Sequence, residues 1–277
     1  MSGPGQGSEE VLVTRVREVG GQTVTERSPD AVVVEEPMSI RLDGTLVSTT
    51  MRTPGHDFEL AAGFCFTEGL LGGMPVTDVG YCTDLGVRDD SSVVTVDTDG
   101  RAPAPSPRLG NVSSSCGWCG SELLDDLCAW LEPLVGSVPI DLDVLRGVPA
   151  EVASGQQLFE ATGAAHGAAA FDDQGRVLLL REDVGRHNAV DKVIGRLLLD
   201  DQLPASQAGL FVSGRASVEM VQKAWAGGFG TLLAVSAPTA LAVRTAERAG
   251  MVLAGFVRGD GFNVYTGPPP GDRSPSL

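Results

Sequence analysis

The fold is decided by residues 209–257, GLFVSGRASVEMVQKAWAGGFGTLLAVSAPTALAVRTAERAGMVLAGFV. Three short apolar runs in it have the length of buried strands: Gly209–Val212, Thr231–Val235 and Met251–Val257. Two segments typical of helices separate them, Ser217–Ala226 and Thr239–Ala249. Buried strands that alternate with helices are typical of a layered α/β domain, and we predict one here.

The same alternation continues on both sides of this stretch. Further helices are expected at Ser121–Leu134, where Ser121 can cap the first turn, and at Pro149–Ala161 and Asn188–Leu199. Further strands are expected at His166–Phe171, Val177–Leu180 and, antiparallel after a turn, Asn263–Thr266. These elements place the α/β domain at residues 121–266, with a disordered tail rich in Pro and Gly at 267–277.

Residues 11–97 predict a different, strand-rich domain with one helix. Strands are expected at Val11–Val16, Ala31–Glu35, Ser39–Leu42 and Thr45–Met51, with short strands and turns over Val76–Val96. Asp43-Gly44 is a strong hairpin signal, because both residues of such a turn need a positive φ. The helix is expected at Asp57–Leu71, where apolar residues recur at helical spacing. Residues 1–10 predict a disordered end, and residues 98–120 a connector between the domains.

Composition excludes several classes of protein. The chain has 277 residues, with 20 Lys and Arg against 36 Asp and Glu, a net charge of −16. Such an acidic chain argues against nucleic acid as the main partner, because phosphate binding needs a basic face. Met1–Glu10 does not have the pattern of a signal peptide, and no apolar run reaches the length of a membrane span. We therefore expect a cytoplasmic protein without membrane contact, in which the five cysteines stay reduced unless they bind metal or do chemistry.

The sharpest local signal is the pair of cysteines in Ser113-Ser-Ser-Cys116-Gly-Trp-Cys119-Gly120. The two glycines and the small serines predict a mobile, accessible loop, and a helix N-terminus follows it, where a thiolate is favoured. Acidic residues in the first turns of that helix would act in the opposite direction by raising a thiol pKa. The spacing therefore fits thiol chemistry, with Cys116 or Cys119 as the reacting group.

Two other interpretations of the pair stay open. Half of a structural zinc site would need a second pair of ligands, but Cys65, Cys82, Cys128 and the three histidines do not have ligand spacing, and we expect no zinc. Cys65 and Cys128 fall within expected helices and are better explained as core residues. A thioredoxin-like dithiol oxidoreductase is the third possibility, although here the motif follows a polar connector and not a buried strand.

Six ordered blocks of sequence resemble the formate dehydrogenase accessory sulfurtransferases, the FdhD family, over about residues 30–266. The blocks are the Cys-Gly-Trp-Cys-Gly loop, RTPGHD with FCFTEGLL (52–57 and 64–71), EDVGRHN with AVDKVIG (182–195), SGRAS (213–217), SAPTA (236–240) and GFVRGDGFNVYT (255–266). Together they are far more specific than a Cys-x-x-Cys motif alone. The resemblance implies a cytidine deaminase-like fold for the second domain.

The resemblance also implies a function. Members of this family take sulfur as a persulfide from a cysteine desulfurase and pass it to the molybdenum cofactor, bis-molybdopterin guanine dinucleotide, which is destined for formate dehydrogenase. It assigns the persulfide to Cys116, with Cys119 as the second thiol, and implies a homodimer. A chaperone that protects the cofactor without sulfur chemistry is an alternative function.

One candidate for binding an anionic cofactor is the segment from Phe256 to Gly261. It consists of Phe256, Val257, Arg258, Gly259, Asp260 and Gly261 and follows an apolar strand. Arg258 can pair with phosphate, the glycines allow close backbone approach, and Asp260 can accept from a guanine edge. The segment also matches the cofactor-binding segment of the family. An ordinary β-turn is the other interpretation.

A second set of candidates lies at helix starts. Arg186 and His187, with Lys192 one turn further, open an expected helix, and Arg215 precedes the next one. Asp183 and Asn188 could instead cap the first of these helices. His166 lies among alanines in an apolar run, where a histidine of the core is the simpler interpretation.

Overall fold

The computed structural model describes residues 7–82, 92–104, 128, 130–134, 140–258 and 261–267. The expected disordered tail lies outside these residues, apart from Gly267. So do most of the expected connector and most of the helix expected at Ser121–Leu134.

A six-stranded mixed sheet forms the centre of the larger layer, in the order β12-β11-β10-β9-β7-β8. Its strands are β7 (His166–Phe171), β8 (Val177–Asp183), β9 (Gly209–Val212), β10 (Thr231–Ala234), β11 (Val252–Arg258) and β12 (Gly261–Thr266). Strands β9, β10 and β11 are parallel, whereas β7 is antiparallel to both of its neighbours and β12 is antiparallel to β11. Strands β8 to β11 therefore all end at the same edge of the sheet.

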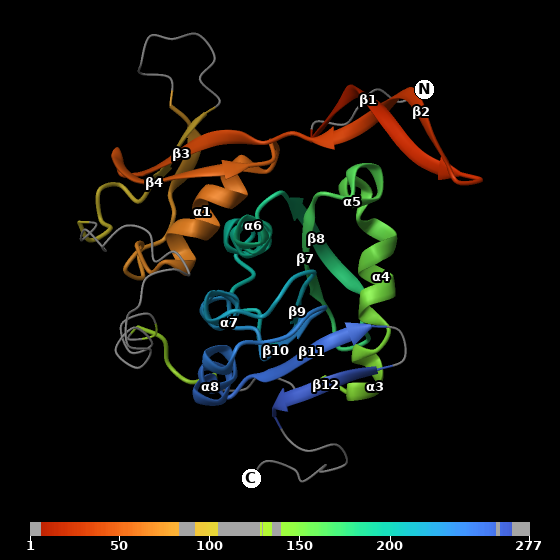
Figure 1. Cartoon of the computed structure of the whole chain (residues 1–277). Helices are drawn as coiled ribbons and strands as arrows, with labels where there is room; N and C mark the ends of the chain where they lie inside the picture. Colours follow the sequence, from red (N-terminus) through yellow and green to blue (C-terminus); the bar gives the residue numbers. More distant parts are fainter. Residues whose placement is uncertain are drawn as a thin grey trace.

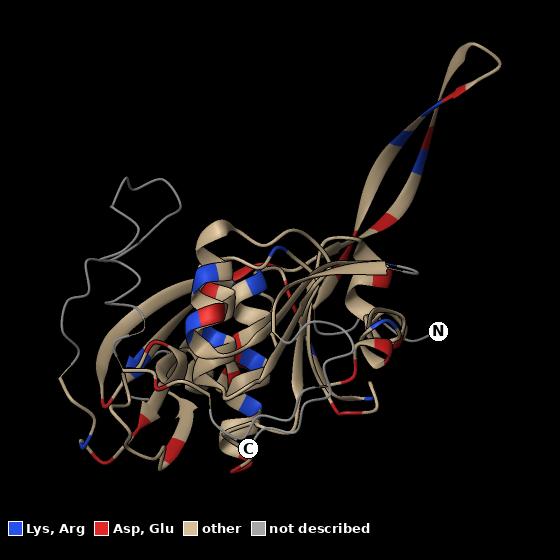
Figure 2. Ribbon diagram, turned by 90° about the horizontal axis from the view of Figure 1, so that it is seen from below, with Lys and Arg blue, Asp and Glu red and all other residues tan. Residues whose placement is uncertain are grey.

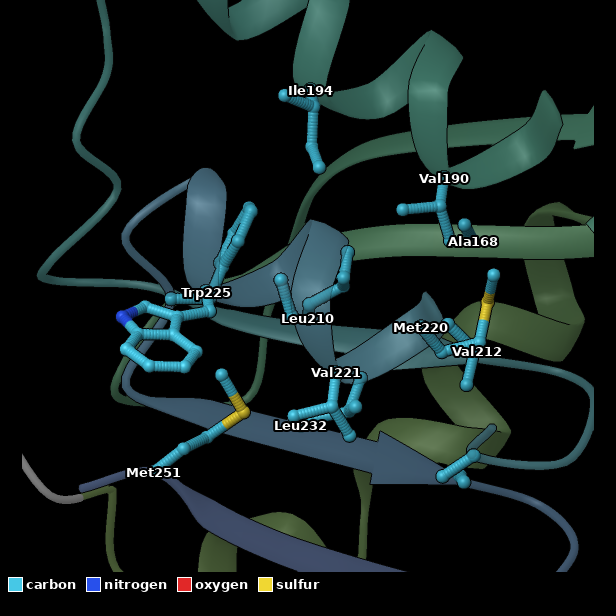
Figure 3. Packing of buried hydrophobic residues seen from close by; sticks show 14 of the residues in the cluster. Ala168, Val190, Ile194, Leu210, Val212, Met220, Val221, Trp225, Leu232 and Met251 are labelled. Atoms are coloured by element: carbon cyan, nitrogen blue, oxygen red, sulfur yellow. The ribbon is translucent and has the colours of Figure 1, made fainter. Parts of the chain in front are cut away.

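Helices cover both faces of this sheet (Figure 1). On one face lie α6 (Arg186–Leu199), α7 (Val218–Ala226) and α8 (Ala240–Ala249), and on the other α3 (Leu142–Leu145), α4 (Val148–Gly155) and α5 (Gln157–Thr162). Figure 3 shows the core under α6 and α7, where Val190, Leu210 and Val221 are fully buried. The alternation of apolar runs and helices thus correctly predicted the mixed α/β architecture.

The N-terminal residues form a smaller four-stranded sheet in the order β4-β3-β6-β5. Its elements are β3 (Glu36–Leu42), β4 (Thr45–Arg52), β5 (Asp78–Tyr81), β6 (Val93–Asp97) and the helix α1 (Asp57–Thr67) on one face. Asp43 and Gly44 join β3 to β4 with φ values of 46° and 81°. The hairpin predicted from Asp43-Gly44 is therefore confirmed.

A long two-stranded hairpin, β1 (Ser8–Val19) and β2 (Gln22–Val33), contacts α5 and projects beyond the rest of the molecule (Figures 1 and 2). Residues 8–10, which we expected to be disordered, are part of β1. The sequence also predicted only the last part of β2. The part before Ala31 is largely polar and contains Pro29, so it lacks the apolar alternation of a half-buried strand.

The single helix expected at Pro149–Ala161 is wrong, because the chain forms α4 and α5 with a break at Gln156. The break is explained by Glu182 of β8. Its two carboxylate oxygens accept hydrogen bonds from the backbone nitrogens of Leu158 and Phe159, both at 2.8 Å. A carboxylate at these nitrogens starts a new helix, since it satisfies N–H groups that have no partner inside the helix.

The two layers meet where α1 crosses α6, and two glycines permit the approach. A Cβ atom on Gly63 would overlap the carbonyl oxygen of Asp191, and one on Gly195 would overlap that of Glu59. The helix backbones are therefore in direct contact at this crossing, with no room for a side chain between them.

Candidate functional site

Two loops and the last residues of β11 lie side by side at the sheet edge where β9, β10 and β11 end. The Ser236 nitrogen donates to the Gly214 carbonyl at 3.2 Å, and the Phe256 nitrogen donates to the Ser236 carbonyl at 3.2 Å. These bonds join the loops after β9 and β10 to the end of β11 in one surface. In α/β sheets ligands commonly bind outside this edge, so it is the candidate site of the molecule.

Strand β11 ends at Arg258 and so places it at this edge. Phe256 has a φ of 55° and a side chain that is 44% exposed, and Val257 is buried. Arg258 is exposed, and its Nε donates to the Val235 carbonyl at 3.4 Å. Arg258 pairs with Gly261 in the antiparallel ladder. The segment therefore lies between β11 and β12 and carries an exposed cation, while Gly259 and Asp260 lie outside the described residues.

His166 lies at the start of β7, on the same edge. Its Nδ1 is 3.2 Å from the Ser213 hydroxyl, which also receives a hydrogen bond from the Gly167 nitrogen at 3.0 Å. Burial and the charge of Arg186 lower the pKa of His166, and Asp183 acts in the opposite direction. His166 is half-buried and uncharged at neutral pH, so it is neither a pure core residue nor an exposed one.

Arg186 and His187 begin α6 next to His166. Burial, Lys223 and Arg186 lower the pKa of His187 to about 4, so this imidazole is also uncharged. The Arg186 Nε is buried and has no hydrogen-bond partner among the described residues. Arg215, on the loop after β9, is exposed. Arg186 is therefore a candidate cation with a buried donor that no described residue satisfies.

Lys192, in contrast to Arg186, is paired with a carboxylate of the fold. Its ammonium lies 2.7 Å from an Asp183 carboxylate oxygen and donates to the Thr53 carbonyl at 3.0 Å, and both charged side chains are buried. Asp183 also accepts hydrogen bonds from the Gly185 nitrogen and from the Asn188 side-chain amide. Gly185 is the N-cap residue of α6, and no side chain caps this helix end. Asp183, Asn188 and Lys192 thus join β8 and α6 to the N-terminal layer, and the cap that we considered for Asp183 and Asn188 is not formed.

A second buried charged group, which we did not predict, surrounds Lys223 of α7. Its ammonium contacts Asp191 of α6 at 2.9 and 3.0 Å, the Thr67 hydroxyl at 2.8 Å and Glu68 at 3.0 Å. The Thr67 hydroxyl in turn donates to Asp191 at 2.8 Å. This cluster joins α1, α6 and α7, and the available signal was a lysine in a helix whose other residues are mainly apolar.

A third ion pair, between Glu59 of α1 and Arg181 of β8, predicts a loss of stability in acid. Arg181 donates to both carboxylate oxygens at 2.6 and 2.9 Å. Burial alone would raise the pKa of Glu59, but the bonds from Arg181 and His56 outweigh it and lower this pKa to about 2. The stabilisation is complete above the pKa of the unfolded chain, about 4.3, and is lost as the pH falls through the folded value.

We expect this one group to account for about 3 kcal/mol of the loss of unfolding free energy on acidification from about pH 6 to about pH 2. Urea denaturation of the natural chain and of Glu59→Gln at both pH values checks it. The variant should be less stable at the higher pH and should lose less on acidification. An equal loss in both proteins would contradict the assignment.

The cysteines divide between the core and the undescribed loop. Cys65 and Cys128 are buried, which confirms them as core residues, and burial together with Asp191 raises the pKa of Cys65 to about 12. Cys82 is half-buried. Cys116 and Cys119 lie outside the described residues. Within the described residues, no three His, Cys, Asp or Glu side chains are grouped so that they could hold a metal ion.

None of the helices in the described part of the chain is both long and apolar enough to cross a bilayer.

Comparison with protein families gives a match over most of the chain. Residues 33–270 match the model of the FdhD/NarQ family. The chain belongs to the FdhD/NarQ family. The match covers both sheets and the intervening loop, so the resemblance seen in the six sequence blocks is confirmed.

Relatives within this family are similar over nearly their whole length. The sulfur carrier protein FdhD of Nocardia farcinica is 44% identical over 245 residues, covering 87% of this chain and 88% of the relative. That of Streptomyces avermitilis is 41% identical over 275 residues, covering 95% of each. A crystal structure of a candidate formate dehydrogenase accessory protein from Desulfotalea psychrophila superposes with a TM-score of 0.71 over 94% of this chain and 97% of the other, at 23% identity. At that identity the superposition supports the fold alone.

Proposed function

We propose that this chain is a sulfur carrier that acts in the maturation of formate dehydrogenase. The observation that carries the proposal is its 41–44% identity to proteins named sulfur carrier protein FdhD over 87–95% of its length. The cysteine pair in the Cys116–Cys119 loop fits that role, since a carrier needs a thiol that can accept and release sulfur.

The proposed chemistry is thiol exchange at Cys116. Its thiolate attacks the outer sulfur of a persulfide on a cysteine desulfurase, a new S–S bond forms, and the donor cysteine leaves as a thiolate. Release follows when the Cys119 thiolate attacks the Cys116 sulfur, which closes a disulfide and expels hydrosulfide, or when the acceptor attacks the outer sulfur directly. No external oxidant is needed in either route.

The proposed cargo is the molybdenum cofactor in its bis-molybdopterin guanine dinucleotide form. Its pyrophosphates need local positive charge on an acidic protein, and exposed Arg258 at the carboxyl edge offers it. Phe256, Gly259, Asp260 and Gly261 complete the proposed binding segment. Three adjacent parallel strands with helices on both faces support the proposed likeness of this layer to cytidine deaminases. We also propose a homodimer in the cytoplasm.

Mass measurement of the intact protein tests the sulfur chemistry. After incubation with a cysteine desulfurase and cysteine, we expect the natural chain to gain the mass of one sulfur atom and Cys116→Ala to gain none. Cys119→Ala should still gain the sulfur but release it more slowly. Cys65→Ala is the matched control, because that thiol is buried and its pKa is raised to about 12.

Two alternative functions give different results in the same experiment. A dithiol oxidoreductase would form the Cys116–Cys119 disulfide without gaining sulfur, and this outcome would overturn the carrier proposal. A cofactor chaperone without sulfur chemistry would leave Cys116→Ala able to restore formate dehydrogenase activity to a deletion strain. We expect that restoration to fail.

A further inference from the structure

A group of hydrogen-bond donors lies at the carboxyl edge, on the side away from Arg258, where β7 begins and α6 starts. The Gly167 nitrogen can only donate, so the Ser213 oxygen accepts its hydrogen bond at 3.0 Å. The Ser213 hydroxyl hydrogen is then available for His166 Nδ1 at 3.2 Å. Ser213 therefore holds the imidazole through its Nδ1 atom.

This arrangement allows the Ser213 hydroxyl to donate to His166 Nδ1, with the ring hydrogen on Nε2. The pKa of His166 is lowered by burial and by Arg186, against the opposing charge of Asp183, so the ring is neutral at neutral pH. A neutral imidazole that accepts at Nδ1 has its hydrogen on Nε2. In the tautomer that accepts from Ser213 at Nδ1, His166 offers an Nε2–H donor that no described residue uses.

Arg186 adds further donors at the same place. A Cβ atom on Gly214 would lie 3.7 Å from Arg186 Cδ and 3.9 Å from His166 Cε1, so the two side chains pack around the same bare backbone. The Arg186 Nε is buried without a hydrogen-bond partner, and no ion pair of Arg186 occurs within the described residues. Buried guanidinium donors are normally satisfied, and leaving one unsatisfied is costly.

The carboxylates close to Arg186 and His166 do not satisfy the donors of these two side chains. Asp183 lies in its own ion pair with Lys192 at 2.7 Å. Glu219 interacts electrostatically with Arg186 and with His187 without forming a contact as short as an ion pair among the described residues. The group thus presents donors from Arg186 and His166, and the complementary ligand is one that carries only acceptors.

We propose that Arg186 and His166, with His166 positioned by Ser213, form an anion-binding position that takes a phosphoryl oxyanion. Guanidinium and imidazole N–H groups match the several acceptor oxygens of a phosphoryl group better than they match a thiolate, which accepts hydrogen bonds weakly. The source of the group is the pyrophosphate of the guanine-containing cargo, and to this extent the inference rests on the proposed function. Arg186 then binds the phosphate chain in addition to Arg258.

Calorimetric titration of the full chain with GDP, pyrophosphate and guanosine tests this position. We expect Arg186→Gln to weaken binding of GDP and of pyrophosphate by about tenfold or more, since a charge-assisted bond is lost. Ser213→Ala, which frees His166 without removing a charge, should weaken both by about threefold. Arg244→Gln removes an exposed arginine of α8 and should leave both affinities within about twofold.

The outcomes separate this inference from the proposed function. If Arg186→Gln binds pyrophosphate as tightly as the natural chain, or if the natural chain binds neither anion, the position is refuted, whatever the sulfur adduct on Cys116 shows. A loss for pyrophosphate with unchanged GDP binding would support the oxyanion position but assign it to a separate small anion. Unchanged guanosine binding and an unchanged circular dichroism spectrum would show that Arg186→Gln has kept its fold.

Discussion

Replacing Lys223 with methionine should lower the free energy of unfolding by about 3–5 kcal/mol, because it leaves a buried carboxylate without its counter-ion. Lys223 and Asp191 are 3% and 2% exposed, and the ammonium contacts both carboxylate oxygens. Methionine fills a similar volume, so little of the loss can come from a cavity. The effect therefore measures the uncompensated charge of Asp191.

Burial and the attraction between the two charges act in opposite directions on the pKa values of Lys223 and Asp191. Burial raises the pKa of Asp191 to about 6, although Lys223 lowers it. Burial would lower the pKa of Lys223, but Asp191 and Glu68 outweigh it and raise this pKa. We take the pair as ionised at neutral pH, because the ammonium donates to both oxygens of Asp191 at 2.9 and 3.0 Å.

Chemical denaturation measures the loss, and a second variant isolates its cause. The double variant Lys223→Met, Asp191→Leu should recover much of the stability, since apolar residues of similar size often replace a buried ion pair without loss. Arg146→Met breaks the exposed pair with Asp143 at 3.6 Å and should cost no more than about 1 kcal/mol. Equal stability of Lys223→Met and the natural chain would refute the structural role of this cluster.

Replacing Gly195 with alanine should have a comparable effect through steric overlap. The added methyl group would collide with the carbonyl oxygen of Glu59, and neither helix backbone can yield as a side chain would. Inserting atoms into a packed interior commonly costs about 1–3 kcal/mol of unfolding free energy, and we expect a collision with backbone to cost about 3 kcal/mol or more. We expect α1 and α6 to separate and the N-terminal layer to detach.

Gly80→Ala is the matched control, since a Cβ atom at Gly80 would meet no other atom within 4 Å. It should change the unfolding free energy by no more than about 0.5 kcal/mol. Gly63→Ala should behave like Gly195→Ala, because its Cβ atom would meet the backbone of Asp191. Denaturant unfolding and protease sensitivity of the N-terminal layer give the readout. A stable, resistant Gly195→Ala protein would show that the helices are not in backbone contact.

The parts of the fold that local sequence determines were predicted well. Asp43-Gly44 marked its hairpin because few residues accept a positive φ. The strands and helices of Gly209–Val257 followed from apolar runs of strand length between amphipathic segments. Errors occurred where a distant residue decided the structure, as when Glu182 of β8 starts α5 and divides an otherwise continuous helical pattern.

In the candidate site, too, local sequence identified candidate residues, but distant residues decided their roles. Sequence drew attention to both Arg186 and Lys192, which lie on the same helix six residues apart. Only the tertiary structure separates them, because Asp183 neutralises Lys192 whereas no described carboxylate pairs with Arg186. The bond between His166 and Ser213 joins residues 47 positions apart, a separation that no local pattern reveals. Cys116, Cys119, Gly259 and Asp260 remain predictions from sequence.

Both lysines of this chain, Lys192 and Lys223, are buried in ion pairs and are only 1% and 3% exposed. The folded surface consequently presents no side-chain amine to acylating reagents, to amine-directed crosslinkers or to enzymes that modify lysine. Labelling of Lys223 would require the junction of α1, α6 and α7 to open first, and labelling of Lys192 the junction of β8 and α6 with the N-terminal layer. The rate of lysine acylation would thus report the rate at which these buried regions open.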